Sequence, residues 1–376
     1  MDTATVGTRA ASRLAARATA VTPTTTEVET IMSAAEVIRI TGRSPLRAAD
    51  HHDEPTVAKV AVVIPALNEA PTIRAVVEGV PRTIPGVAEV EVILVDDGST
   101  DGTQAEAIAA GVDAIAHHPR RRGLVSTFKD GVTEALRRGA SIVVNLDGDG
   151  QHDPAQIPAL IAPILANRAD IVLGVRDLST AEMTPIRRHG NMAGTWVTRR
   201  ALGLDVSDVT TGFRAFSRDA LLRLNVTSEF TYTLETLVEA ARKRLTVAEV
   251  PVPVRPRIAG TSRMTHNVLA YITRTGFQAM NALVRDRLVR LFGIGALVCV
   301  LAGAAFAAVF LVGYRADGAG RHLPALLAAL MFVIVGVGLF VSRLIADGIE
   351  TSRRLLEETL YMVRRHEVGD TGRGGW

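Results

Sequence analysis

The segment Ile142-Val143-Val144-Asn145-Leu146-Asp147-Gly148-Asp149-Gly150-Gln151 decides the fold class of this chain. Its first half is a short apolar run of the kind that forms a buried β-strand. Asp147 and Asp149 follow directly where that strand should end. In open α/β sheets, ligands bind beyond the carboxyl ends of the strands. The segment therefore predicts an α/β domain with a ligand site at this pair of carboxylates.

On both sides of this segment, from Val60 to Val254, apolar runs alternate with helical patterns. This alternation is typical of a mostly parallel sheet covered by helices. We expect strands at Val60–Pro65, Val90–Val95, Ile142–Leu146, Asp170–Val175 and Val247–Val254. The first four of these strands each end in a polar cluster. These clusters should converge on one site, and they comprise Asn68, Glu69, Asp96, Asp97, Asp147, Asp149, Arg176 and Asp177.

Some polar residues near these ends have simpler explanations. Asp101 with Gln104 resembles a capping box that opens a helix, and Asp153 before Pro154 resembles an N-cap followed by proline at the first helical position. His117 and His118 are adjacent and therefore poorly placed to bind one metal together, so we treat them as loop residues. None of these residues is assigned to the chemistry.

Asp147 and Asp149 lie one residue apart and can jointly hold Mg²⁺ or Mn²⁺, which prefer oxygen ligands and usually share their coordination with substrate phosphates. A calcium loop of the EF-hand kind is excluded, because His152 stands where that loop needs glycine and Pro158 where it needs glutamate. A plain Asp-Gly turn remains the alternative interpretation.

Two apolar stretches near the C-terminus change the class of the protein. Leu291–Val312 and Leu323–Val341 each carry about 20 residues without a charge, enough to cross a hydrocarbon layer of about 30 Å. The connector between them is short, so we expect a hairpin of two transmembrane helices. The alternative is a buried helical hairpin in a soluble protein, in which charge-free runs of this length are rare.

The arginines around these spans predict their orientation. They are more numerous outside the hairpin, at Arg285, Arg287, Arg290, Arg343, Arg353 and Arg354, than in its connector, at Arg315 and Arg321. The positive-inside rule therefore places both ends in the cytosol. The single cysteine, Cys299, allows no intrachain disulfide and suits a reducing compartment. We expect a multi-pass protein of the inner (plasma) membrane with its α/β domain in the cytosol.

The chain thus divides into five expected regions. Residues 1–57 are rich in Thr, Ala and Arg and lack the apolar core of a signal peptide, so we expect a disordered arm with one short helix near Ser33–Ile40. Residues 58–264 form the α/β domain, 265–290 an amphipathic helix, 291–346 the hairpin and 347–376 an amphipathic cytosolic tail. Either amphipathic segment could instead be a homo-oligomer contact. The net charge of +3 gives no reason to expect a nucleic-acid partner.

Six motifs together resemble a known family. Ile64-Pro65-Ala66-Leu67-Asn68-Glu69, the run from Val95 to Thr103 and Asp147-Gly148-Asp149-Gly150-Gln151 resemble, in order and spacing, the motifs of family 2 glycosyltransferases with the GT-A fold. Gly174-Val175-Arg176, Asp208–Arg214 and Arg257–Arg263 are similar to the dolichyl-phosphate mannose synthase group. The match covers about Val60 to Arg263, and the hairpin is similar to that of bacterial polyprenyl-phosphate glucosyltransferases. Gly148 replaces the usual alanine, and Arg263 stands where the family commonly has lysine.

This resemblance implies an enzyme that transfers a sugar, with inversion, from a UDP- or GDP-linked donor to polyprenyl phosphate. The expected partners are the nucleotide-sugar, the polyprenyl phosphate and membrane lipid, and the expected cofactor is Mg²⁺ or Mn²⁺. Two rivals remain. A processive polysaccharide synthase usually carries a Gln-x-x-Arg-Trp element, which does not precede Trp196 or Trp376. A non-catalytic nucleotide-sugar-binding membrane scaffold is disfavoured by the intact Asp97, Asp147 and Asp149.

The resemblance also implies roles for single residues. The donor pocket would be lined by Pro65, Leu67, Glu69, Val95, Asp97, Asp147, Gly148, Gln151 and Arg176, and the metal would be held by Asp147, Asp149 and Gln151. The catalytic set would comprise Asp149, Asp208, Arg257 and Arg263, with the arginines clamping phosphates.

Three of these interpretations have alternatives. Arg176 could be an ordinary exposed arginine, and Asp208 with Arg214 could simply fix a turn. The cluster Arg187-Arg188-His189 could meet the lipid phosphate or form a solvated helix face.

Overall fold

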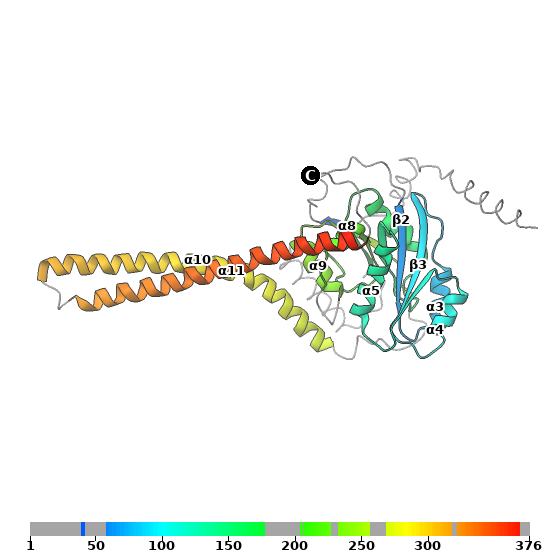
Figure 1. Cartoon of the computed structure of the whole chain (residues 1–376), viewed down its shortest axis with the longest axis horizontal. Coiled ribbons are helices and arrows are strands. Elements are labelled where there is room, and N and C mark those ends of the chain that lie inside the picture. Colours follow the sequence, from blue (N-terminus) through cyan, green and yellow to red (C-terminus); the bar gives the residue numbers. More distant parts are fainter. Residues whose placement is uncertain are drawn as a thin grey trace, which may run out of the picture. The chain divides into compact units, whose positions relative to one another are not determined.

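Figure 1 shows the computed structural model of the chain, which describes residues 39–41, 58–176, 204, 206–226, 232–255, 268–317 and 322–368. The chain divides into two compact units. Met1–Ile272 and Arg364–Trp376 form one, called here the sheet unit, and Thr273–Val363 form the other, called the hairpin unit.

The sheet unit is built on a mixed sheet of eight strands within the described residues. The strands are β1 (Arg39–Thr41), β2 (Ala58–Ala66), β3 (Val87–Asp96), β4 (Ala114–His117), β5 (Ile142–Asn145), β6 (Ile171–Arg176), β7 (Arg214–Ser217) and β8 (Val247–Val252). Their order across the sheet is β1-β8-β6-β7-β5-β2-β3-β4. Only β1 and β7 pair antiparallel with their neighbours. The carboxyl ends of the other six therefore lie along one edge.

The mostly parallel α/β sheet is confirmed, as are the five expected strands. Three strands were not expected. β4 and β7 have four residues each, and β1 lies within the region expected to be a disordered arm. β1 pairs with β8 through Arg39 to Thr41, so a short helix reaching Ile40 was a wrong prediction at these residues. The rest of residues 1–57 lies outside the described residues.

Helices cover the sheet because their apolar faces pack on its branched side chains (Figure 1). They are α3 (Ala70–Glu78), α4 (Thr103–Ala109), α5 (Leu124–Arg137), α6 (Ile157–Leu165) after the short 3-10 helix Pro154–Gln156, α8 (Arg218–Arg223) and α9 (Tyr232–Arg242). α5 crosses β2 and β3 very closely at Gly131. A Cβ atom there would lie 2.3 Å from Val63 and 2.9 Å from Val95, so this crossing needs glycine.

The two expected helix starts have different outcomes. Asp153 accepts a hydrogen bond from the Ala155 nitrogen at 3.0 Å, which confirms it as a cap. The expected capping box at Asp101 was wrong, because the Gln104 side chain donates a hydrogen bond to Asp96 instead. Asp101 accepts hydrogen bonds from the backbone nitrogens of both Ala70 and Thr103, the first residues of α3 and α4. It thus provides acceptors for backbone N–H groups at the start of two helices.

The hairpin unit contains most of α10 (Val268–Asp317) and most of α11 (Leu323–Glu367). Both contain stretches long and apolar enough to cross a membrane by length and composition. The expected amphipathic segment at 265–290 and the first span are one continuous helix from Val268, and the second span continues into the expected tail as far as Glu367. Gly303 faces the Ala329 carbonyl and Gly336 the Ala296 carbonyl, which is the small-residue packing common between membrane helices.

Candidate functional site

The loop after β5 is held tightly against α3 and β2. The Thr72 hydroxyl donates to the Gly148 carbonyl at 2.7 Å, and the Gln151 nitrogen donates to a carboxylate oxygen of the buried Asp149 at 3.1 Å. A Cβ atom on Gly148 would lie 3.4 Å from the Pro65 carbonyl, which is ordinary contact. The structure therefore brings Pro65 and Gly148 together and has room for the alanine usual at position 148.

Asp147 faces a loop that is distant in sequence. A Cβ atom on Gly212 would lie 2.5 Å from a carboxylate oxygen of Asp147, so any larger residue there would displace that carboxylate. The Asn145 amide donates to the Gly212 carbonyl and to the Tyr232 hydroxyl, each at 2.9 Å. Burial first, and then the charge of Asp147, raise the pKa of Tyr232, which keeps that hydroxyl neutral. Gly212, Asn145 and Tyr232 thus frame Asp147.

The loop that carries Gly212 is anchored by the buried Arg214. Its guanidinium donates to the carbonyls of Val209, Thr211 and Thr233 at 3.0, 2.8 and 2.6 Å, and to the Thr236 hydroxyl at 2.8 Å. These contacts join the loop to α9. For Arg214 they support the interpretation that it fixes the turn.

The same loop also packs on β6. The Thr211 hydroxyl donates to the Gly174 carbonyl at 2.8 Å, and a Cβ atom on Gly174 would lie 2.8 Å from the Phe213 ring. Asp208 is buried and accepts from the nitrogen and hydroxyl of Thr210 at 2.9 and 2.7 Å. Its contact with an acceptor stays a prediction.

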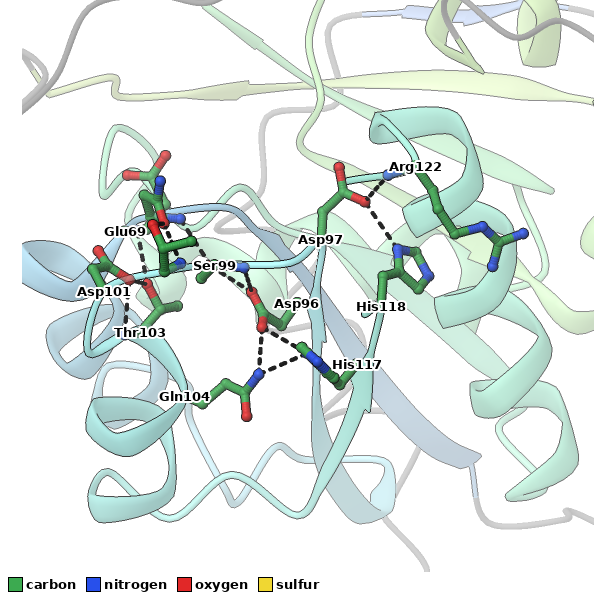
Figure 2. Close-up of polar contacts among 12 residues, drawn as sticks. Glu69, Asp96, Asp97, Ser99, Asp101, Thr103, Gln104, His117, His118 and Arg122 are labelled. Carbon is green, nitrogen blue, oxygen red and sulfur yellow. Dashed lines mark hydrogen bonds and ion pairs between the residues drawn. The ribbon is translucent and has the colours of Figure 1, made fainter. Parts of the chain in front are cut away.

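The two aspartates at the end of β3 point in opposite directions (Figure 2). Asp96 is fully buried and accepts hydrogen bonds from Ser99, Gln104 and His117. Burial alone would raise the pKa of Asp96, but these hydrogen bonds outweigh it and lower the pKa below its ordinary value. Asp96 therefore organises the turn that leads into α4.

Asp97 instead faces the loop that leads into α5 (Figure 2). Its oxygens accept from the nitrogens of Arg122 and Gly123 at 2.7 and 2.9 Å, and one of them lies 2.9 Å from Nδ1 of His118. His118 lies in the loop after β4, as expected, but it is buried, with 4 % of its surface exposed. His117 is instead the last residue of β4, so treating it as a loop residue was wrong. The burial of His118 could not be read from the His-His pair.

The loops after β2 and β3 are joined to each other (Figure 2). The backbone nitrogens of Asn68 and Glu69 donate to the hydroxyl oxygens of Ser99 and Thr103, respectively, each at 2.9 Å. The Thr100 nitrogen donates to the Asn68 amide oxygen at 2.8 Å. Asn68 adopts a left-handed backbone with φ of 51°, which asparagine tolerates. Leu67 and Glu69 therefore sit on a loop fixed against the end of β3, where Pro65 pairs with Val95.

Most of the arginines expected to bind phosphate lie in parts of the chain that the structure does not describe. The side chain of Arg176 and all of Arg257, Arg263 and 187–189 lie outside the described residues. The strand before Arg257 is described, and it ends at the β5 loop: the Arg255 nitrogen donates to the Gln151 carbonyl at 2.8 Å. Arg255, the last described residue before the segment 256–263, therefore lies beside Gln151.

The donor set after β5 fits a hard divalent cation. Asp147 and Asp149 offer carboxylate oxygens, and Gln151 follows in the same turn. The described residues contain no group of three His, Cys, Asp or Glu side chains that could hold a metal. Mg²⁺ is commonly bound by one or two carboxylates plus substrate phosphates, so a pair of carboxylates suffices for a site shared with a ligand.

These features define an α/β domain with its candidate site at the carboxyl edge of a mostly parallel sheet, where such domains commonly bind ligands. Residues 61–224 match the profile of the family described as Glycosyl transferase family 2. A polyprenol monophosphomannose synthase of Mycolicibacterium smegmatis is 30% identical over 249 residues, which cover 63% of this chain and 91% of that protein. The chain belongs to glycosyl transferase family 2.

Two further proteins show similarity to part of this chain. An undecaprenyl-phosphate mannosyltransferase of Micrococcus luteus is 29% identical over 249 residues, which cover 61% of this chain and 99% of that protein. Among solved structures, the glucosyl-3-phosphoglycerate synthase of Mycobacterium tuberculosis with Mn²⁺, UDP and glucosyl-3-phosphoglycerate aligns with a TM-score of 0.48. That alignment has 23% identity and covers 59% of this chain and 80% of that one.

Proposed function

We propose that this chain transfers a sugar from a UDP- or GDP-linked donor to polyprenyl phosphate, with inversion at the sugar. The carrying observation is the pair Asp147 and Asp149, placed where the loops after β2, β3 and β5 meet in a member of glycosyl transferase family 2. The proposal of this acceptor is supported by the relatives named for undecaprenyl-phosphate mannosyl transfer and polyprenol monophosphomannose synthesis.

In this proposal the donor nucleoside lies against the ends of β2 and β3. Pro65 and Val95 pair in register there, and Leu67 and Glu69 follow on the joined loops. Asp97 and Glu69 would accept hydrogen bonds from the base or ribose. Gly148 would allow the donor to approach the loop after β5, and Arg176 would meet the diphosphate from the end of β6.

Asp147, Asp149 and Gln151 would hold Mg²⁺ or Mn²⁺. When bound, the cation neutralises charge on the departing diphosphate, which is the main electrostatic problem of the reaction. The residues around it keep the carboxylates in place: Thr72 fixes Gly148, and Gly212 leaves room for Asp147.

The acceptor needs positioning more than activation. A phosphate monoester carries about −1.5 to −2 charges near neutral pH, so it can attack the anomeric carbon without a strong general base. Arg257 and Arg263 would bind the lipid phosphate, since guanidinium matches phosphate oxygens with two parallel donors. This role is supported by Arg255, two residues before Arg257, which donates to the Gln151 carbonyl beside the proposed metal site. Asp208 would orient the acceptor from its loop.

The hairpin would anchor the enzyme in the membrane. Its apolar side chains are largely exposed, with Leu297, Leu301 and Val312 showing 60%, 61% and 71% of their surfaces. Exposed apolar surface of this extent needs a partner outside the unit, and a lipid bilayer provides one. We place the spans in the plasma membrane with the sheet unit in the cytosol.

The experiment that tests this function uses the full chain purified in detergent. It would be incubated with radiolabelled UDP- and GDP-sugars, with and without polyprenyl phosphate, in Mg²⁺. We expect one donor to give a lipid-extractable product only when the acceptor is present. Stepwise growth of a long polysaccharide would indicate a processive synthase instead, and donor binding without any product would indicate a scaffold.

Orientation is tested separately with tags in cells. A tag inserted at Gly318, in the connector, should be reached by an impermeant reagent from outside, whereas tags before Val60 and after Trp376 should not. A sheet unit accessible from outside would contradict the proposed orientation.

A further inference from the structure

His118 lies between two carboxylates from different elements. Its Nδ1 is 2.9 Å from an oxygen of Asp97, at the end of β3, and its Nε2 is 2.8 Å from an oxygen of Asp130, on α5. Ionised carboxylates only accept hydrogen bonds, so the ring satisfies both when each nitrogen carries a hydrogen. The ring is buried, whereas the Asp130 side chain is 39% exposed. His118 thus connects Asp97 to the solvent side of α5.

Arg122 provides a second connection between Asp97 and Asp130. The Arg122 guanidinium lies 2.9 Å from the same oxygen of Asp130, and the Arg122 nitrogen donates to Asp97 at 2.7 Å. Asp97 therefore meets Asp130 by two routes, one through His118 and one through Arg122. With both routes in place, the Asp97 carboxylate has little freedom to rotate.

Counting acceptor positions shows what this leaves for a ligand. A carboxylate has about four lone-pair directions. Within the part of the chain that the structure describes, one oxygen of Asp97 takes His118 and Arg122, and the other takes Gly123 at 2.9 Å. One lone-pair position remains, on the oxygen that accepts from Gly123. The contact with His118 fixes which oxygen accepts two hydrogen bonds and which oxygen keeps the remaining position.

We propose that His118 is a positioning residue that holds Asp97 in the orientation in which it accepts a hydrogen bond from the donor nucleoside. This inference rests on the proposed function, because it takes the end of β3 as the nucleoside pocket. His118 does not touch the ligand and acts through Asp97. Loss of its Nδ1 donor should therefore weaken nucleotide binding, whereas the contact of Nε2 with Asp130 should matter less.

Two substitutions separate the ring's two contacts. In His118→Asn the amide nitrogen stands near the place of Nδ1 and keeps the donor toward Asp97. In His118→Gln it stands near the place of Nε2 and keeps only the contact with Asp130. His117→Asn is the matched control, because His117 contacts Asp96 and its side chain is 47% exposed.

The measurement is calorimetric binding of UDP and of GDP to the full chain in detergent with Mg²⁺, together with the thermal midpoint of each variant. We expect His118→Gln to weaken binding of the preferred nucleotide about tenfold, the effect of one hydrogen bond to a charged group. His118→Asn and His117→Asn should stay within about threefold of the wild type. Equal affinities in the Asn and Gln variants of His118, whether both intact or both weakened, would overturn the inference. If the wild type binds neither nucleotide, the proposed function itself fails and the inference falls with it.

Discussion

Two pairs of carboxylates follow the strands on either side of β2, and their surroundings differ. The pair after β3, Asp96 and Asp97, accepts hydrogen bonds from the loops that begin α4 and α5 (Figure 2). In the pair after β5, Asp149 accepts from the Gln151 nitrogen of the same turn, and the Asp147 carboxylate lies against Gly212. The first pair therefore joins separate loops, whereas the second lies at the turn after β5. We infer that the β3 pair shapes the pocket and the β5 pair acts on the substrate.

The largest expected effect is on the β5 pair. Asp149→Asn should lower sugar transfer at least about 10²-fold, because an amide cannot replace an anionic ligand at the main electrostatic stabiliser. Its thermal midpoint should stay close to that of the wild type. Asp153→Asn is the matched control: it removes the same charge in the same loop, and asparagine caps a helix as well as aspartate does. Equal activity of Asp149→Asn and Asp153→Asn would contradict the inference that the β5 pair acts on the substrate.

A second effect concerns the acceptor. Arg263→Ala should weaken transfer to polyprenyl phosphate by about 1.5 to 3 kcal/mol, the value of a charge-assisted hydrogen bond, while slow hydrolysis of the donor continues. The readout is the ratio of lipid-linked product to free sugar, with calorimetric titration of the donor in the absence of lipid. Loss of donor binding in that titration would move this segment to the donor pocket.

A smaller effect should follow when a single methyl group is added at Gly212, beside Asp147 of the β5 pair. Gly212→Ala places a Cβ atom within 2.5 Å of Asp147 and must displace its carboxylate, so we expect about a tenfold loss of activity. Gly148→Ala makes contacts no closer than 3.4 Å and should be tolerated. Steady-state kinetics of the two variants compare them directly. Wild-type kinetics for Gly212→Ala would show that the position of Asp147 is not critical.

The smallest effect is the pH dependence of the β3 pair. The pKa of Asp96 is held below its ordinary value of 3.8, so its ionised form stabilises the fold fully above that pH. This contribution is lost as the pH falls through the lower pKa of the folded state. The difference in thermal midpoint between wild type and Asp96→Asn should therefore be constant down to about pH 4 and shrink below it. A difference that grows on acidification would contradict the assigned direction.

The sequence was most informative where chemistry is local. Long apolar runs predicted β2, β3, β5, β6 and β8, and the polar clusters after them predicted the carboxyl edge as the site. β4 was missed because its four residues are at most partly buried, and β7 because it begins with a buried arginine that looks polar in any local pattern. Tertiary pairing, rather than propensity, makes them strands.

Contacts between distant segments could not be predicted in the same way. Nothing near Asp147 in the sequence indicates that Gly212 and Tyr232 will frame it, since 65 or more residues separate them. His118 looked like half of a loop dipeptide, but the fold places Asp97, after β3, and Asp130, on α5, on the two sides of its ring. Gln104 was expected to cap its own helix, but Asp96 offers it a charged acceptor.

The most direct test of the central claim is restoration of transfer by metal. The full chain, treated with EDTA, would be given its labelled donor and polyprenyl phosphate, and Mg²⁺ or Mn²⁺ would then be added back. The account predicts no lipid-linked sugar in EDTA, recovery on adding metal, and no recovery in Asp149→Asn. Full transfer by Asp149→Asn in EDTA-treated buffer would contradict the assignment of the β5 carboxylates.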